Sequence, residues 1–366
     1  MRVEVSHRDT ASALVNTADA IRANGGFVAD DFLVREVDGH FSCAISDQIG
    51  EVGRPLVSYP PRLTVPLSAI TWSTSDDALE PVAGLGGLTT VQREFLDDWL
   101  TLVNVTGKLA QMRSLIPNLA VNDVSLRLHL AHAGYPDLAE PAGAATAHDA
   151  LIRTHSLRMP PQKDGAGETW RLIPLKHLVN HHPSGAEQLL QPSLVTVSTS
   201  ATSDEIETFE NYGDLDAMQL LMLFGFVDDA SPLVHSIPTA AVGSSLGCVR
   251  VIGRAPRNPR PGHLQNVPNL TPTTDGFQLG HLTLRQRNRE SLVGYLAMAL
   301  RARTGCSRRT AVMGAEDILD QLAQSNLDYY RRLDELAAPA TGTDPILAMI
   351  AAVSRRQQER ITAMWR

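Results

Sequence analysis

TWRLIPLKHLVNHHP, residues 169–183, is an apolar segment that ends in a polar cluster of one Asn and two His. Pro183 closes the segment and Gly185 follows two residues later, and both residue types interrupt helices. Three interpretations fit this pattern. The cluster could bind a metal, cap the end of a helix, or line a pocket for a cofactor.

The metal interpretation depends on His177 and His181, which are four residues apart and would share one face of a helix, as zinc ligands do. No Cys or acidic residue stands at a matching spacing nearby, and Pro183 ends any helix here. We therefore expect no metal, and we favour the cofactor pocket over the helix cap.

The composition is that of an ordinary globular protein. Of 366 residues, 43% are hydrophobic and the net charge is −8, which argues against nucleic acid as the main partner. The cysteines, Cys43, Cys248 and Cys306, are too far apart for a zinc motif or a disulfide framework. The charged N-terminus is unlike a signal peptide, and the most apolar run, residues 217–227, is too short to span a bilayer. We expect a cytoplasmic protein with no membrane partner.

Hydrophobic periodicity changes several times along the chain. Apolar residues recur at helical spacing over residues 10–26, and short apolar runs separated by turn residues follow over 27–65. Residues 91–160 are mostly of helical type, and residues 169–250 return to short strands around one buried helix. From about residue 288 the chain has three amphipathic helical segments.

These patterns predict an α+β fold of two domains. The first covers residues 1–270 and is rich in short, mostly antiparallel strands, with a helical insertion at about 91–160. The second covers residues 275–366 and is all-helical.

GSSLG, residues 243–247, matches the turn that carries the nucleophile of α/β-hydrolases, with Ser245 as the nucleophile. That turn needs a helix after it, whereas the following residues are typical of a strand and a loop. The segment is better explained as a Gly/Ser turn.

Four segments in order resemble the SET-domain methyltransferases of the Rubisco large-subunit methyltransferase type, the class that includes actin-histidine methyltransferase. They are AIRANGGFVADDFLVREVDG (20–39), RPLVSYPPRLTV (54–65), LIPLKHLVNHHP (172–183) and SDEIETFENYGDLDAMQLLMLFGFVD (203–228). Each motif alone is weak, but together they extend over most of the chain.

The resemblance implies a SET fold, in which the segment that carries Tyr212 threads beneath the loop with Asn180 and His181. It implies S-adenosylmethionine as cofactor and a protein lysine, or a histidine, as acceptor. The cofactor-binding residues would be Asn180, His181 and the turn at Gly39, His40 and Phe41. Tyr212 takes the place of the catalytic tyrosine, and the helices after residue 275 suit that class's substrate-binding domain.

The sequence departs from the family at several of these positions. The second Gly of the family's Gly-x-Gly turn is Phe41 or Ser42, and a bulky residue is unfavourable there if the turn needs a positive φ.

Three residues are assigned to the substrate pocket. His177 stands where an Asp is usual, Phe224 stands where a Tyr is frequent, and Arg158 matches an upstream Arg only loosely. The departures leave two alternatives open, a SET-fold enzyme that acts on a small molecule and a catalytically silent binding module.

Overall fold

The computed structural model describes residues 1–45, 52–75, 77–135, 138, 146–159, 169–187, 189–191, 194–199, 207–243, 247–253, 268–285, 288–338 and 344–365. The chain forms two compact units, and each is assembled from two stretches of sequence. The first unit is Met1–Ser114 with Ala145–Tyr212, and the second is Leu115–Ala144 with Gly213–Arg366. Among the described helices, none combines the length and apolar character that a bilayer crossing requires.

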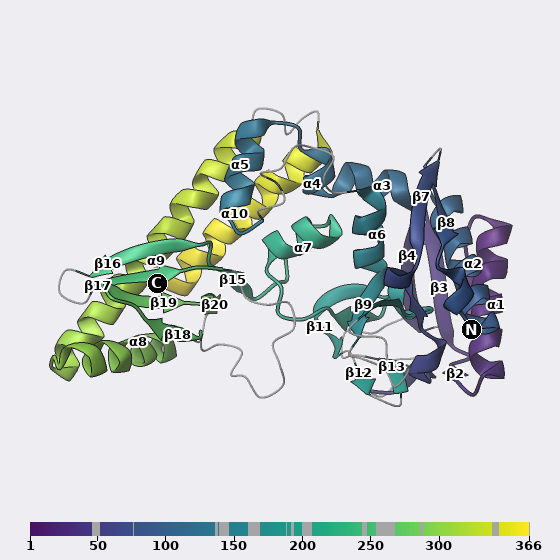
Figure 1. Cartoon of the computed structure of the whole chain (residues 1–366), viewed down its shortest axis with the longest axis horizontal. Helices are drawn as coiled ribbons and strands as arrows, with labels where there is room; N and C mark the ends of the chain where they lie inside the picture. Colours follow the sequence, from purple (N-terminus) through teal and green to yellow (C-terminus); the bar gives the residue numbers. More distant parts are fainter. Residues whose placement is uncertain are drawn as a thin grey trace. The chain divides into compact units, whose positions relative to one another are not determined.

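The first unit combines small sheets with helices (Figure 1). Its strands are β1 (Arg2–Glu4), β2 (Phe27–Val28), β3 (Phe32–Val37), β4 (His40–Ile45), β5 (Pro55–Tyr59), β6 (Val65–Pro66), β7 (Thr71–Ser75), β8 (Ala78–Ala83), β9 (Ser156–Met159), β10 (Thr169–Leu172), β11 (Asn180–Glu187), β12 (Leu189–Gln191), β13 (Leu194–Ser198) and β14 (Phe209–Asn211). Its helices are α1 (Arg8–Ala23), α2 (Thr90–Val105), α6 (Ala147–His155) and most of α3 (Lys108–Leu115), with short 3-10 turns at Pro61–Leu63, Leu67–Ala69, Leu85–Gly87 and Lys176–Leu178.

Long-range pairing joins the two sequence stretches of this unit. Strand β5 pairs with β13 and β6 pairs with β10, so residues near 60 lie beside residues near 170 and 195. Most of the described strand pairs are antiparallel, and the parallel pairs are β1–β3, β11–β14 and β17–β19. The expectation of short, mostly antiparallel strands is therefore confirmed.

A tight hairpin joins β3 to β4. Val37 pairs with His40, which leaves a two-residue turn in which Asp38 has φ 51° and Gly39 has φ 76°. This Asp-Gly turn has positive φ at both central residues, as a type I′ hairpin requires. Phe41 and Ser42 lie inside β4 as ordinary strand residues. Phe41 and Ser42 therefore avoid the penalty expected for a bulky residue at a position of positive φ, because the positive φ values fall at Asp38 and Gly39.

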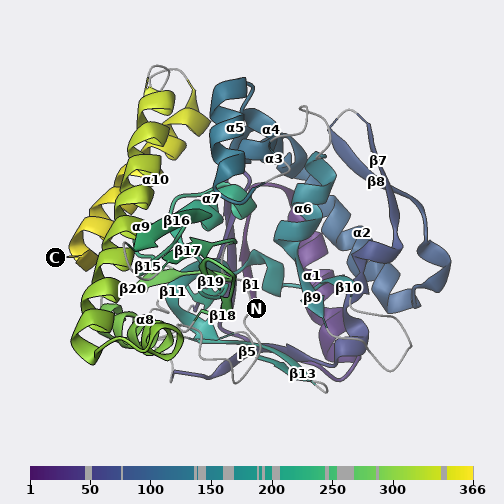
Figure 2. The same ribbon diagram turned by 60° about the vertical axis from the view of Figure 1, so that its left-hand side comes forward.

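The second unit packs strands and a helix against long helices (Figures 1 and 2). Its helices are α4 (Pro117–Ala120), α5 (Val124–His132), α7 (Ala217–Phe224), α8 (Arg289–Thr304), α9 (Arg308–Ala337) and α10 (Pro345–Trp365). Its strands are β15 (Leu233–His235), β16 (Thr239–Gly243), β17 (Gly247–Val251), β18 (Leu270–Pro272), β19 (Gly276–Leu279) and β20 (Thr283–Arg285).

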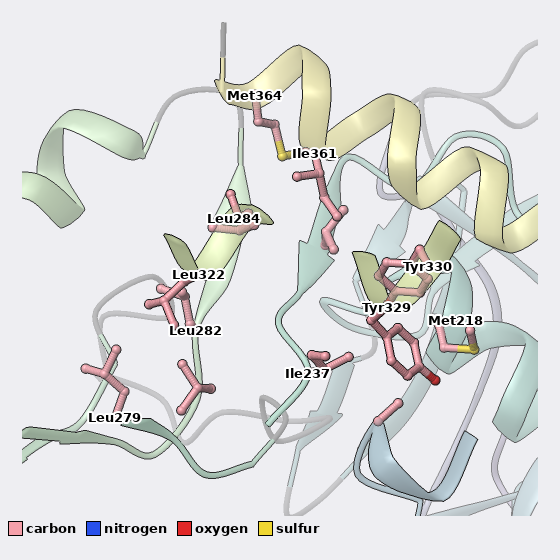
Figure 3. Packing of buried hydrophobic residues seen from close by; sticks show 14 of the residues in the cluster. Met218, Ile237, Leu279, Leu282, Leu284, Leu322, Tyr329, Tyr330, Ile361 and Met364 are labelled. Carbon is pink, nitrogen blue, oxygen red and sulfur yellow. The ribbon is translucent and has the colours of Figure 1, made fainter. Parts of the chain in front are cut away.

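The core of the second unit is apolar and continuous. Figure 3 shows Leu322 of α9 near Leu284 of β20 and Leu282, which lies just before that strand, and Ile361 and Met364 of α10 belong to the same cluster. Helix α5 contacts α9 through a reciprocal pair. His129 Nε2 lies 3.0 Å from the Tyr329 carbonyl oxygen, the Tyr329 hydroxyl donates to the His129 carbonyl at 3.1 Å, and the two rings stack 4.3 Å apart.

The observed boundaries confirm an α+β fold and the helical character of residues after 288. The second unit is not all-helical, however, because β19 and β20 lie beyond residue 275. The division of the chain also differs from the expected 1–270 and 275–366. Residues 213–270 group with the C-terminal helices, and α4 and α5 of the expected insertion do so as well, because the apolar faces of α5 and α7 pack against α9 and α10.

Candidate functional site

Three segments that are distant in the sequence meet in the first unit. Strand β11 pairs in parallel with β14, with Asn180 opposite Phe209 and His181 opposite Glu210. The backbone N–H of Thr208, just before β14, donates to the Cys43 carbonyl of β4 at 2.6 Å. Residues 208–211 of the 203–228 motif therefore lie beside Asn180 and His181 of the 172–183 motif, and both segments contact β4.

The orientation of the Asn180 side chain is decided by its neighbours. Its Nδ2 donates to the Phe41 carbonyl at 3.0 Å and to Glu207 Oε1 at 2.6 Å. Both partners are acceptors only, so the nitrogen, and not the oxygen, must point toward them. Asn180 is exposed, and no described residue donates to its Oδ1. The oxygen is therefore available to an incoming donor, whereas the amide hydrogens are already used.

Tyr212 is held by the segment that precedes and begins β11. Its hydroxyl donates to the Val179 carbonyl at 2.5 Å, and its backbone N–H donates to His181 Nδ1 at 3.0 Å. Because His181 Nδ1 accepts, its proton is on Nε2. The rings of His181 and Tyr212 are 5.1 Å apart. Tyr212 and the Asn180–His181 pair, assigned to one site by resemblance, are brought together by the fold.

Gly185 explains how the two segments come so close. A Cβ at this position would lie 2.4 Å from the Glu210 carbonyl carbon and 2.8 Å from the Asn211 nitrogen. Asn211 adds a further link, since its Nδ2 donates to the Pro183 carbonyl at 3.0 Å. Only glycine permits this approach of backbone to backbone.

Beneath the site lies a buried ion pair that sequence reasoning missed. Lys176 Nζ contacts Glu210 Oε2, and the two side chains are 3% and 1% exposed. The second carboxylate oxygen, Glu210 Oε1, is buried without a hydrogen-bond partner. Burial raises the pKa of Glu210, and the Lys176 ammonium opposes that rise. The pair ties the turn before β11 to the strand that leads into Tyr212.

The backbone just before Lys176 is strained. Leu175 has φ 60° and ψ −35°, and the Lys176 N–H donates to the Pro174 carbonyl two residues back at 2.7 Å. This is close to a classical γ-turn, a rare conformation for a residue with a side chain. Such strain persists only where the surroundings enforce it, and it is concentrated at functional sites.

A cluster of basic side chains borders the site. Lys108 is 9% exposed, its Nζ lies 5.6 Å from the centroid of the Phe41 ring, and it donates to Gln111 at 3.1 Å. Burial lowers the pKa of Lys108 to about 8, although the Glu36 carboxylate opposes this shift. Phe41 therefore links the Lys108 ammonium to the site, because the Phe41 ring contacts Lys108 and the Phe41 carbonyl accepts from Asn180.

His155 and His177 complete this basic cluster, and their rings are 5.5 Å apart. Trp99 Nε1 donates to His155 Nδ1 at 3.1 Å, and His177 Nδ1 lies 3.2 Å from the Ile173 carbonyl. Because the Ile173 carbonyl can only accept, His177 Nδ1 must carry the proton. His177 Nε2 is then an acceptor, and this atom is buried without a hydrogen-bond partner. Burial and the Lys108 charge lower the pKa of His177 to about 4 and that of His155 well below its usual value.

Gly39 and its neighbours have mainly structural contacts. A Cβ on Gly39 would lie 2.8 Å from the Thr106 carbonyl oxygen, and its N–H donates to Glu36 at 2.6 Å. His40 is exposed, and Phe41 is buried with its carbonyl bound to Asn180. Of the three turn residues assigned to the cofactor, Phe41 has a direct bond to another residue of the site.

The remaining assigned residues stay predictions. Arg158 lies in β9 opposite Trp170 of β10. Ser245, which the sequence pattern already argued against as a nucleophile, lies outside the described residues. Phe224 belongs to the second unit, where it is the last residue of α7 and its ring lies 6.1 Å from that of Phe226.

The metal interpretation assumed that His177 and His181 share a helical face. His177 lies instead in a 3-10 turn and His181 in strand β11, so the assumed geometry is wrong. Within the described ranges, no group of three or more His, Cys, Asp or Glu side chains could hold a metal ion.

Carboxylates give this site a negative character. Burial raises the pKa of the Cys43 thiol far above its usual value, and the charges of Glu207 and Glu210 raise it further. Both carboxylates are thus close enough to act on β4 where it meets β14. Glu210 is already paired with Lys176, so a positively charged ligand would be stabilised mainly by Glu207.

No family model matches the chain, and a comparison with curated protein sequences gives no match. Among solved structures, the chain is similar to a crystal structure of the SET domain of LSMT bound to MeLysine and AdoHcy, with 11% identity, a TM-score of 0.45, and coverage of 96% of this chain and 90% of that chain. A structure of the same SET domain bound to Lysine and AdoHcy gives 11% identity, a TM-score of 0.43, and coverage of 97% and 90%.

Proposed function

We propose that the protein is an S-adenosylmethionine-dependent N-methyltransferase of the SET type, with a protein lysine or histidine as acceptor. One observation carries the proposal. Two of the segments singled out by resemblance and the Gly39–Phe41 turn assigned to the cofactor are joined at Asn180, which binds Phe41 of that turn and Glu207 of the fourth segment while Tyr212 binds Val179 beside it. Motifs matched by chance would have no reason to converge on one side chain.

The residues present suit the cofactor's amino-acid tail. Asn180 Oδ1 is free to accept from the tail's ammonium, and the nearby Glu207 carboxylate favours positive charge. The backbone of Phe41 and His181 would contact the rest of the molecule. When bound, the cofactor supplies a methyl group activated by a positive sulfonium. The site therefore needs acceptors and carboxylates more than additional cations.

Tyr212 would orient the acceptor nitrogen. Its ring position is set by bonds from both ends, the backbone N–H to His181 and the hydroxyl to Val179. A fixed phenol and converging backbone carbonyls can align a nucleophile with a methyl group through weak C–H hydrogen bonds. The acceptor nitrogen must be neutral to attack. A lysine must therefore lose its proton first, which desolvation beside a positive sulfonium favours.

A second candidate acceptor is a small amine or an imidazole. Lys108, His155 and His177 form a basic cluster bordering the site, and His177 Nε2 offers a buried lone pair but no negative charge. The Lys108 charge and the two neutral imidazoles favour an acceptor that is neutral when it binds, such as an imidazole, over any protonated amine. A neutral acceptor would be consistent with His177 at a position where the related enzymes usually have an acid.

The proposal is tested with S-adenosylmethionine labelled in its methyl group. Calorimetry of the full chain should show cofactor binding, and incubation with a cell lysate should label protein bands. Binding without labelled protein, followed by labelling of small amines, would identify the second candidate. No binding heat and no thermal shift would refute both and leave a binding module.

A further inference from the structure

A hairpin of two helices in the second unit borders a cavity that is open to solvent and lies outside the candidate site. Helices α8 and α9 are joined by Gly305, Cys306 and Ser307, and Gly305 has φ 67° at the end of α8 (Figure 1). The cavity between the helices has a volume of about 630 Å³. This is within the range of pockets that bind small organic ligands, roughly 300–1,000 Å³.

The lining of the cavity is apolar along most of its length. It includes Gly294, Ala297 and Met298 from α8 and Val312 from α9. Met298 is 67% exposed, and a Cβ on Gly294 would meet nothing within 4 Å. The lining therefore leaves room for an apolar ligand and exposes surface that such a ligand would cover.

Two guanidinium groups stand at the end of the cavity near the turn. Arg301 and Arg308 both line it, both are exposed, and neither has an ion pair or side-chain hydrogen bond within the described part of the chain. Their neighbours differ. Arg303 donates to the carbonyls of Thr273, Thr274 and Gly276, and Arg289 pairs with Asp320.

The first turn of α9 strengthens this positive end. It contains no acidic residue, and the Ser307 side chain caps it by accepting from the Thr310 N–H. The start of a helix favours negative charge.

We propose that the cavity binds a small molecule with an apolar body and a single carboxylate, and that Arg301 and Arg308 hold the carboxylate. Guanidinium groups bind carboxylates with two parallel hydrogen bonds. A neutral apolar compound would leave both arginines unused, and a highly charged compound would gain nothing from the apolar lining. Binding of this ligand does not depend on the proposed methyltransferase activity.

Calorimetric titration of the full chain with decanoate tests the proposal, with decanol as the neutral control. Arg301→Gln and Arg308→Gln should each weaken decanoate binding roughly tenfold or more, because each removes charge-assisted hydrogen bonds. Arg309→Gln is the matched control, since Arg309 is exposed on the same turn but does not line the cavity.

Gly294→Phe is a second variant, which should block the cavity while improving the helix propensity of α8. The proposal is overturned if decanoate fails to bind, if decanol binds as well, or if the Arg301 and Arg308 variants bind like the Arg309 control.

Discussion

The region around β11 and β14 and the three C-terminal helices bury different kinds of polar group. In α8, α9 and α10, the buried polar residues are Asn326, Ser354 and Gln357, all neutral. Around β11 and β14 they include Lys176, Glu210 and His181.

Burying ionisable groups is costly unless they are paired, and even a good pair contributes little net stability. The three helices avoid the cost of burying ionisable side chains. The β11–β14 region bears that cost, which folding stability alone does not explain. The difference supports placing the proposed site in the β11–β14 region rather than in these helices.

The sharpest test of this comparison is to break the buried ion pair. Glu210→Ala leaves the Lys176 ammonium buried without compensation and should lower the free energy of unfolding by about 3–5 kcal/mol. The double variant Lys176→Met, Glu210→Leu should recover most of that loss. Tryptophan fluorescence can follow the first unit, which contains Trp72, Trp99 and Trp170. A single variant as stable as wild type would show that the pair is not buried.

The helical core should respond to loss of volume instead. Leu319 of α9 is 0% exposed, and Leu319→Ala should lower stability by about 2–5 kcal/mol through lost burial and a cavity. Far-ultraviolet circular dichroism during thermal unfolding measures the change. Met313→Ala on the same helix is the control, because Met313 is 59% exposed and should change stability little. Cofactor affinity at 25 °C should be the same in both variants.

Tyr212→Phe separates chemistry from packing at the site. The ring is kept and the hydroxyl bond to Val179 is lost, so cofactor affinity should persist. If the hydroxyl acts only in the transition state, turnover should fall about 10²-fold, or about 2.7 kcal/mol. Single-turnover kinetics with labelled cofactor measures this. Full activity in the variant would remove Tyr212 from the catalytic role.

Asn180 offers two informative substitutions. Asn180→Ala removes the free Oδ1 and should weaken cofactor binding by roughly 1–3 kcal/mol. Asn180→Asp keeps an oxygen there but places a second one against Phe41 O and Glu207, so it should also lower the thermal midpoint. Calorimetry and thermal scans compare both with Ser184→Ala, an exposed control on the same strand. Equal cofactor affinity in all three would make Asn180 structural.

The smallest expected effect concerns pH. The pKa of His177 is about 4 in the folded protein, below the value of 6.5 expected when unfolded. Between these values the unfolded chain binds a proton that the folded chain does not, so stability falls as pH decreases from 6.5 to 4. At pH 5.5 the lowered pKa of His177 reduces the free energy of unfolding by about 1 kcal/mol relative to neutral pH.

The pH experiment compares wild type with His177→Asn, because Asp98 and Glu210 have raised pKa values and shift stability in the opposite direction. The variant should lose less stability than wild type between pH 7 and pH 5. Identical losses would mean that His177 titrates normally.

Much of the local structure was predictable. The Gly25 stop after α1, the Asp38-Gly39 turn and the amphipathic helices after residue 288 follow from backbone preferences and apolar spacing within a few residues of each position. The grouping of Asn180 with Tyr212 came from resemblance, and the fold places them together.

The partners of Lys108, His155 and Glu210 were not predictable. Each contact joins residues far apart in the sequence, such as Lys176 with Glu210 or Trp99 with His155. The residues next to a Lys or Glu in the sequence do not indicate whether its side chain is buried.

The sequence by itself determined the elements of this protein, because helix caps, turn glycines and hydrophobic periods act over one or two turns of chain. Only the tertiary structure decided which charges lose their water. That depends on segments such as β4, β11 and β14 packing together, and it is this loss of water that shifts the pKa values of Lys108 and His177 and turns Glu210 into a buried partner.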